Sequence, residues 1–289
     1  MTHMVSAQPV RYKDPVFEGV KETRDLSYGT KDSNGTEKAH LFDLYQPSGD
    51  TAALRPLIIW MHGGGFRFGS KNDNSNRLWG RSFAKRGYVF AAINYSLSKK
   101  LPMFNFDELK KSCYIAVVDV KQAVAYFREH SKLYHIDPDK IIIGGNSAGG
   151  MTAMQAAYST DAELAKFAGV NNVSARNTPL KIAAVINFWG AIFNLDWLEN
   201  AHVPVVNVYG LDDSIVSPTH SGPPLFGGAD IHTRATKEGI ANDVKVFEGY
   251  SHELHKHFNS LFSGGKGTRE RWEEASGFAA AFIYRELFE

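Results

Sequence analysis

Residues 141–149 read Ile-Ile-Ile-Gly-Gly-Asn-Ser-Ala-Gly and pass from one kind of secondary structure to another. The three isoleucines favour a buried strand, and the alanine-rich residues after Ser147 favour a helix. Gly145 and Gly149 flank Ser147 at a distance of two positions, as a sharp turn without room for side chains requires. The serine also stands at the N-terminus of the predicted helix, whose dipole favours developing negative charge. Ser147 is therefore a candidate nucleophile.

Short β-branched runs alternate with longer helical patterns along the rest of the chain. The predicted strands are 24–28, 40–45, 56–61, 88–93, 140–144, 181–188, 204–209 and 244–248. The predicted helices are 76–86, 107–134, 148–158, 229–238 and 268–288. This order of elements predicts an α/β fold: an eight-stranded, mostly parallel sheet flanked by helices on both faces.

The patterns within these runs indicate where each strand lies in the sheet. The first two strands alternate apolar and polar residues and are separated by an Asn34-Gly35 turn signal, which predicts an antiparallel hairpin at the edge. Residues 57–61, 141–143 and 182–186 are apolar on both faces, as central strands must be. Residues 137–140, Asp-Pro-Asp-Lys, are expected to end the second helix because proline cannot continue one.

Composition excludes several classes of protein. A chain of 289 residues with 43% apolar residues predicts one domain over 1–289, with 1–8 disordered or left from cloning. The net charge of +1 argues against nucleic-acid binding, and the apolar runs are too short for a membrane span. A single cysteine, Cys113, excludes an internal disulfide. We expect a soluble protein that is either cytoplasmic or secreted with its signal peptide removed. The sequence does not determine its oligomeric state.

A second glycine-rich motif, His62-Gly63-Gly64-Gly65-Phe66, follows directly on the predicted strand 56–61. Consecutive glycines let backbone amides approach a ligand closely, which suits the stabilisation of an oxyanion. The predicted donors are the amides of Gly64, Gly65 and Ala148, the last being the residue after the candidate nucleophile. His62 is interpreted as a residue that holds the loop.

A serine nucleophile needs a base and an acid that orients the base. His252 follows the last predicted strand and is the candidate base. Asp213 follows the seventh strand and is the candidate acid, with Asp212 as the alternative because adjacent turn residues point in different directions. His255 and His257 lack the spacing of a zinc motif and are interpreted as exposed helix residues. We predict neither a metal nor an organic cofactor.

These motifs, in this order, resemble those of the α/β-hydrolase superfamily, and more narrowly of hormone-sensitive-lipase-like carboxylesterases with a His-Gly-Gly-Gly loop. The resemblance runs from about residue 22 to the end of the chain. Asn146 departs from the usual Asp, and only about 15 residues separate Phe188 from Pro204, too few for a large cap. The chain is thus similar to a neighbouring branch, closer to acetyl-xylan and feruloyl esterase-like proteins, with an open site.

The resemblance implies hydrolysis of a small-molecule or polymer-borne carboxylic ester, of short acyl or aryl type, through a covalent acyl-enzyme. Phe66 and Trp189, and less so Phe68 and Phe188, are candidates for an apolar substrate pocket, although they fit a core role equally well. A polyester or lactone hydrolase, or an amidase or peptidase with the same triad, is the alternative. The remaining alternative is a non-catalytic binding protein that keeps the hydrolase fold.

Overall fold

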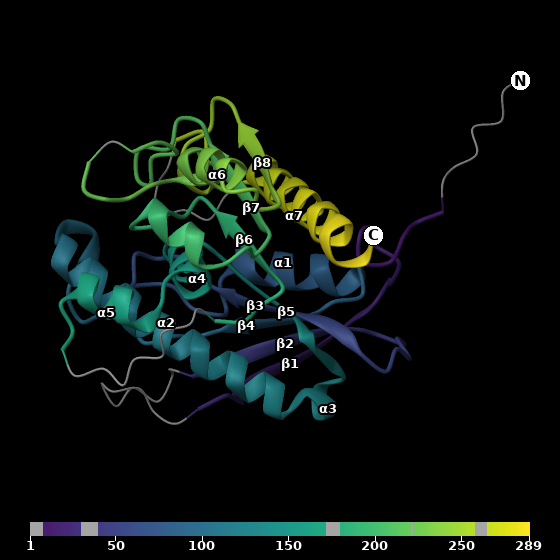
Figure 1. Ribbon diagram of the computed structural model, residues 1–289. Coiled ribbons are helices and arrows are strands. Elements are labelled where there is room, and N and C mark those ends of the chain that lie inside the picture. The colour runs from purple at the N-terminus through teal and green to yellow at the C-terminus, as the bar shows by residue number, and fades with distance from the viewer. Residues whose placement is uncertain (1–7, 30–39, 172–179, 221, 258–264) are drawn as a thin grey trace, which may run out of the picture.

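A computed structural model describes residues 8–29, 40–171, 180–220, 222–257 and 265–289. Its centre is an eight-stranded sheet of order β1-β2-β4-β3-β5-β6-β7-β8 (Figure 1). The strands are β1 (Val20–Ser27), β2 (Leu41–Pro47), β3 (Arg55–Met61), β4 (Val89–Ile93), β5 (Ile136–Asn146), β6 (Ala184–Phe188), β7 (Val205–Gly210) and β8 (Asn242–Phe247). Within the group β3 to β8, every pair of neighbouring strands is parallel, which confirms the predicted mostly parallel sheet.

The antiparallel edge is also confirmed. β1 pairs antiparallel with β2, and β2 pairs antiparallel with β4. The predicted Asn34-Gly35 turn between them lies outside the described residues.

The helices follow the predicted order with two differences. They are α1 (Asn74–Lys85), α2 (Phe106–Glu129), α3 (Ser131–Tyr134), α4 (Ala148–Tyr158), α5 (Asp161–Ala168), α6 (Gly228–Lys237) and α7 (Lys266–Phe288), with the short 3-10 helices η1 (Pro102–Phe104), η2 (Leu195–Asn200) and η3 (His252–Leu254). The predicted helix 107–134 is divided into α2 and α3. The prediction omitted α5, a short helix whose start is fixed by a capping box between Thr160 and Glu163.

The predicted role of residues 137–140 is wrong, because they lie inside β5 and not at the end of a helix. α2 has already ended at Glu129. The pairing of β3 with β5 shifts register between Arg55 and Leu57, whose partners are Ile136 and Ile141. Pro138 therefore stands in an irregular stretch of the strand, where its missing N–H breaks no regular ladder.

Helices cover both faces of the sheet, so the core has two parts (Figure 1). Along β3, Ile59 packs in a cluster with residues of α2 and α4, whereas Trp60 packs on the other face with residues of α1 and α7. Trp79 of α1 donates its indole N–H to the Trp272 carbonyl of α7 at 3.1 Å. Among the described residues, no helix is long and apolar enough to cross a membrane.

A buried ion pair holds the end of the β3–α1 connection against the sheet edge. Lys71 Nζ lies 2.6 Å from Asp43 Oδ1 on β2 and 2.6 Å from Asp25 Oδ1 on β1. The Lys71 and Asp43 side chains are only 2% and 1% exposed. The Lys71 amide also donates to Asn94 Oδ1, just beyond β4, at 2.7 Å. No local pattern in the sequence pointed to this lysine.

Replacement of Lys71 by alanine is expected to lower the free energy of unfolding by about 3 kcal/mol, because it leaves the Asp43 carboxylate buried without a cation. Urea denaturation of the single variants and of the double variant Lys71→Ala/Asp43→Ala measures the coupling. The double variant should recover part of the loss. If the losses of the two single variants simply added up in the double variant, the ion pair would not couple the two residues.

The single thiol gives a further expectation. Cys113 is buried in α2, and burial raises the pKa of its thiol above the ordinary value. Because the thiolate is the reactive form, Ellman's reagent should leave the folded chain unmodified while the urea-unfolded chain reacts completely. Equally fast reaction of folded and unfolded chains would show that the α2 core opens readily.

Candidate active site

The turn between β5 and α4 holds Ser147 in a strained conformation. Its φ and ψ are 54° and −117°, in the positive-φ region that non-glycine residues rarely adopt. The Ser147 amide donates to the Phe188 carbonyl at 2.9 Å. A Cβ on Gly149 would stand 2.0 Å from the Met61 carbonyl oxygen, and one on Gly145 would stand 2.4 Å from the Gly149 carbonyl carbon. These approaches explain why glycines flank the serine.

Three side chains from separate loops meet in one hydrogen-bonded line. His252 Nε2 lies 2.9 Å from Ser147 Oγ, and His252 Nδ1 lies 2.7 Å from Asp213 Oδ2. Since a carboxylate only accepts, Nδ1 donates to Asp213, and Nε2 is then the acceptor in its hydrogen bond with the serine hydroxyl. The other oxygen of Asp213 accepts the amides of Ile215 and Val216, each at 2.9 Å. The imidazole is thus fixed in the orientation and tautomer that a base requires.

Of the two aspartates in the turn after β7, the structure brings Asp213 to the histidine. Asp213 and His252 are buried, whereas Asp212 is exposed. The Asp212 amide donates to the Tyr250 carbonyl at 3.0 Å, which ties the turn after β7 to the turn after β8.

The N-terminal part of α7 supports the loop that carries the histidine. Trp272 Nε1 donates to the Glu253 carbonyl at 2.9 Å, and Arg271 Nε donates to the Leu254 carbonyl at 2.8 Å. The Arg271 guanidinium also lies 3.9 Å from the Tyr250 ring centre. These contacts hold the loop although Glu253 and Leu254 have positive φ values.

The loop after β3 lies next to the serine. A Cβ on Gly63 would stand 3.4 Å from Ser147 Cβ. Gly64 and Gly65 have φ values of 106° and 60°, which only glycine adopts freely. Within the described part of the chain, no group accepts a hydrogen bond from the amides of Gly64, Gly65 or Ala148. The three predicted oxyanion donors are therefore available for a ligand.

His62 holds this loop from within the core. Its Nδ1 donates to the Gly63 carbonyl at 2.7 Å, and its ring stacks on Tyr95 at 4.4 Å. Tyr95 Oη in turn donates to the His62 carbonyl at 2.8 Å. Burial lowers the pKa of His62, so the ring is neutral at physiological pH. A neutral, stacked imidazole acts as a fixed support.

The two aromatic residues proposed for the pocket lie in the core. Phe66 and Trp189 are 0% and 2% exposed and pack in the two hydrophobic clusters on opposite faces of the sheet. Phe188 is equally buried, whereas Phe68 is exposed. This burial favours the core alternative for Phe66 and Trp189.

The interpretation of His255 and His257 as exposed helix residues is wrong for the helix in both cases and for the exposure of His255. His255 follows η3, outside any helix, and is partly buried, with its ring 6.2 Å from that of Trp272. His257 is exposed but also lies outside a helix. Among the described residues, no group of three or more His, Cys, Asp or Glu side chains is arranged to hold a metal.

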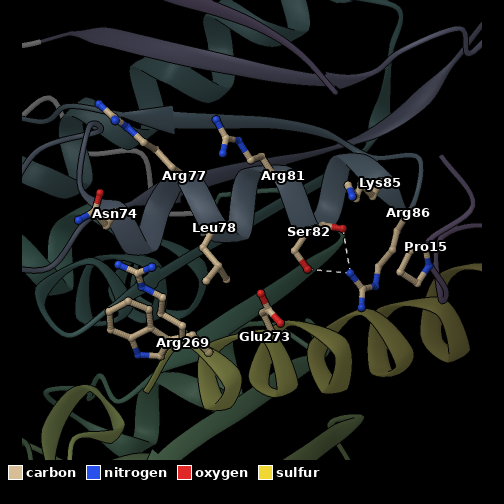
Figure 2. Close-up of a pocket in the computed structure, with 11 residues that line it drawn as sticks. Pro15, Asn74, Arg77, Leu78, Arg81, Ser82, Lys85, Arg86, Arg269 and Glu273 are labelled. Atoms are coloured by element: carbon tan, nitrogen blue, oxygen red, sulfur yellow. Dashed lines mark hydrogen bonds between the residues drawn. The ribbon is translucent and has the colours of Figure 1, made fainter. Parts of the chain in front are cut away.

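A hollow of about 680 Å³ lies elsewhere, between α1 and α7 (Figure 2). Leu78 and Trp272 line its apolar part, and Arg86, at the end of α1, donates to the Ser82 carbonyl and hydroxyl of the same helix. Ser147, Asp213 and His252 are not among its lining residues. The hollow is therefore distinct from the candidate site.

Solved structures with similar folds cover nearly the whole chain. Esterase 2 of Thermogutta terrifontis, phosphoramylated by tabun, is 21% identical with a TM-score of 0.65, over 95% of this chain and 97% of that one. MGS-M1, an α/β hydrolase from a Medee basin deep-sea metagenome, is 16% identical with a TM-score of 0.64, over 94% and 99%. These likenesses confirm the expected α/β-hydrolase fold.

Two curated relatives of higher identity match shorter segments. Bovine (Bos taurus) arylacetamide deacetylase is 29% identical over 172 residues, 57% of this chain and 38% of the relative. The esterase LipQ of Mycobacterium tuberculosis is 31% identical over 141 residues, 48% of this chain and 30% of the relative. The aligned segments thus span less than half of either relative.

The BD-FAE family model matches residues 42–219. This segment includes the glycine-rich loop, the serine turn and the Asp213 turn, and it makes up more than half of the chain. The chain therefore belongs to the BD-FAE family of α/β-hydrolases.

Proposed function

We propose that this protein is a serine hydrolase of carboxylic esters. The observation that carries the proposal is the buried line from Ser147 Oγ through His252 to Asp213, with distances of 2.9 and 2.7 Å. It stands beside the amides of Gly64, Gly65 and Ala148, for which the described residues provide no acceptor. A serine, a base and an oriented acid next to free amide donors are the parts that acyl transfer needs.

In the proposed acylation step, Ser147 Oγ forms a bond to the ester carbonyl carbon as its proton passes to His252 Nε2. Asp213 stabilises the resulting imidazolium through the hydrogen bond at Nδ1. The carbonyl π electrons move to oxygen, and the amides of Gly64, Gly65 and Ala148 donate hydrogen bonds to the negative oxygen. Each such donor is worth about 3 kcal/mol in comparable sites.

The tetrahedral intermediate collapses when the bond to the alcohol oxygen breaks and His252 returns the proton to that oxygen. Water then loses a proton to His252 as its oxygen bonds to the acyl carbon. The bond from that carbon to Ser147 Oγ breaks, His252 returns the proton to Oγ, and the carboxylic acid leaves. The same groups serve in both halves, so no metal or organic cofactor is needed in the proposed cycle.

The names of the relatives support an ester or a related acyl bond as the target. LipQ is an esterase, LipM of Mycobacterium tuberculosis is a probable carboxylic ester hydrolase, and the bovine relative is an arylacetamide deacetylase. Amide cleavage is the second candidate, supported by that last name. A comparison of p-nitrophenyl acetate with p-nitroacetanilide separates the two, and we expect the ester to be the better substrate by far.

Substitution of Ser147 by alanine should lower kcat for p-nitrophenyl acetate by about 10⁴-fold or more while leaving the circular dichroism spectrum unchanged. The His252→Ala variant should lose a comparable amount, because either change removes the same proton transfer. A folded Ser147→Ala variant with more than a tenth of the original activity would refute the assignment.

The two adjacent aspartates provide a matched pair. Asp213→Asn should reduce kcat by about 10³-fold to 10⁴-fold, because the amide favours the wrong tautomer of His252. The exposed Asp212→Asn variant should keep at least half of the activity. The reverse ranking in the same assay would move the acid to Asp212.

A further inference from the structure

A group of exposed apolar side chains stands beside the candidate site, in the connection between β4 and α2. Leu101, Met103 and Phe104 are 51%, 53% and 85% exposed. Phe68 of the neighbouring glycine-rich loop is 60% exposed. Adjacent apolar side chains that are exposed to solvent indicate a binding surface more often than single exposed ones do. We refer to Leu101, Met103 and Phe104 as the apolar turn.

The apolar turn is fastened to the oxyanion loop. The Ser98 amide donates to the Phe66 carbonyl at 2.8 Å, and Arg67 Nη1 donates to the Ser98 carbonyl at 3.0 Å. Ser98 Oγ donates to Glu108 Oε1 at 2.6 Å, which anchors the same residue to α2. Ser98, which leads into the turn, is therefore tied both to the glycine-rich loop and to α2.

Met103 touches the loop at the proposed oxyanion donor. Its Cγ and Sδ both lie 2.7 Å from the place where a Cβ on Gly65 would stand. The thioether thus covers the Cα of a residue whose amide is to hold the oxyanion. Methionine adapts its shape readily and packs well against alkyl and aromatic groups.

The order of strands indicates which half of an ester reaches this turn. β3 and β4 lie on one side of β5, and β7 and β8 lie on the other. His252, which follows β8, has to reach the leaving alcohol oxygen, so the alcohol lies toward its side. The carbonyl oxygen is directed to the amides of the loop after β3, and the acyl substituent on the same carbon extends away from His252, past this loop, where Met103 lies against Gly65.

We infer that the apolar turn binds the acyl group of an apolar carboxylic ester and that Met103 sets the preferred acyl length. The inference rests on the proposed function and adds the substrate class to it. An alkyl or aryl acyl group lying on Met103 and Phe104 would cover apolar surface that both partners otherwise expose to water.

The test uses p-nitrophenyl acetate, butyrate and octanoate, which share one leaving group. We expect Met103→Ala and Phe104→Ala each to lower kcat/KM for octanoate relative to acetate by about fivefold, because each removes apolar contact with the longer chain only. Leu133→Ala is the matched control, since Leu133 is 66% exposed on α3, which leads into the opposite end of β5. The control should keep the ratio within twofold.

A second series, of acetate esters with alcohols of increasing size, separates the two halves of the substrate. The ratios in this series should be the same in the Met103→Ala variant and the unmodified enzyme. An unchanged octanoate-to-acetate ratio in both variants, or a change confined to the alcohol series, would overturn the inference while leaving the esterase itself intact. Absence of all turnover by the unmodified enzyme would instead overturn the proposed function, and the inference with it.

Discussion

The contact between the start of α4 and the end of β3 is the constraint on which the candidate site depends. Gly149 lies so close to the Met61 carbonyl that a Cβ there would be 2.0 Å from the oxygen. This approach forces a sharp turn, and Ser147 takes a φ of 54° within it. The glycine-rich loop begins directly after Met61, so the serine and the free loop amides stand at the same edge of the sheet. Donors placed in advance need no reorganisation during a reaction.

The parts of this arrangement that depend on local sequence could be predicted. The isoleucines of β5 and the glycines on both sides of Ser147 define the strand and the turn by themselves. His252 was identified because it alone follows the last strand in a turn, although the chain has 11 histidines. The sequence leaves Asp212 as an alternative to Asp213, because a turn requires that one of two neighbours points inward but does not determine which one.

Features that arise from packing across the fold could not be predicted. The aromatic identity of Phe66 and Trp189 suits a pocket and a core equally, and only the three-dimensional arrangement buries them. Pro138 signals a break in any regular element, so the sequence alone did not separate a helix end from an irregular strand. Lys71 reaches Asp43 and Asp25 across long sequence distances, with no local pattern to mark the pair. The proposed role of Met103 likewise depends on its contact with Gly65, which is distant in the sequence.

The central claim is that Ser147 is the nucleophile of a covalent reaction. Paraoxon tests it most directly, because attack by the serine oxygen on phosphorus releases p-nitrophenolate and leaves a stable diethylphosphoryl group on the enzyme. The account predicts one adduct per chain by intact mass spectrometry, located on Ser147 by peptide mapping and absent from the His252→Ala variant over the same time. An adduct on another residue, or no adduct on a correctly folded chain, would contradict it.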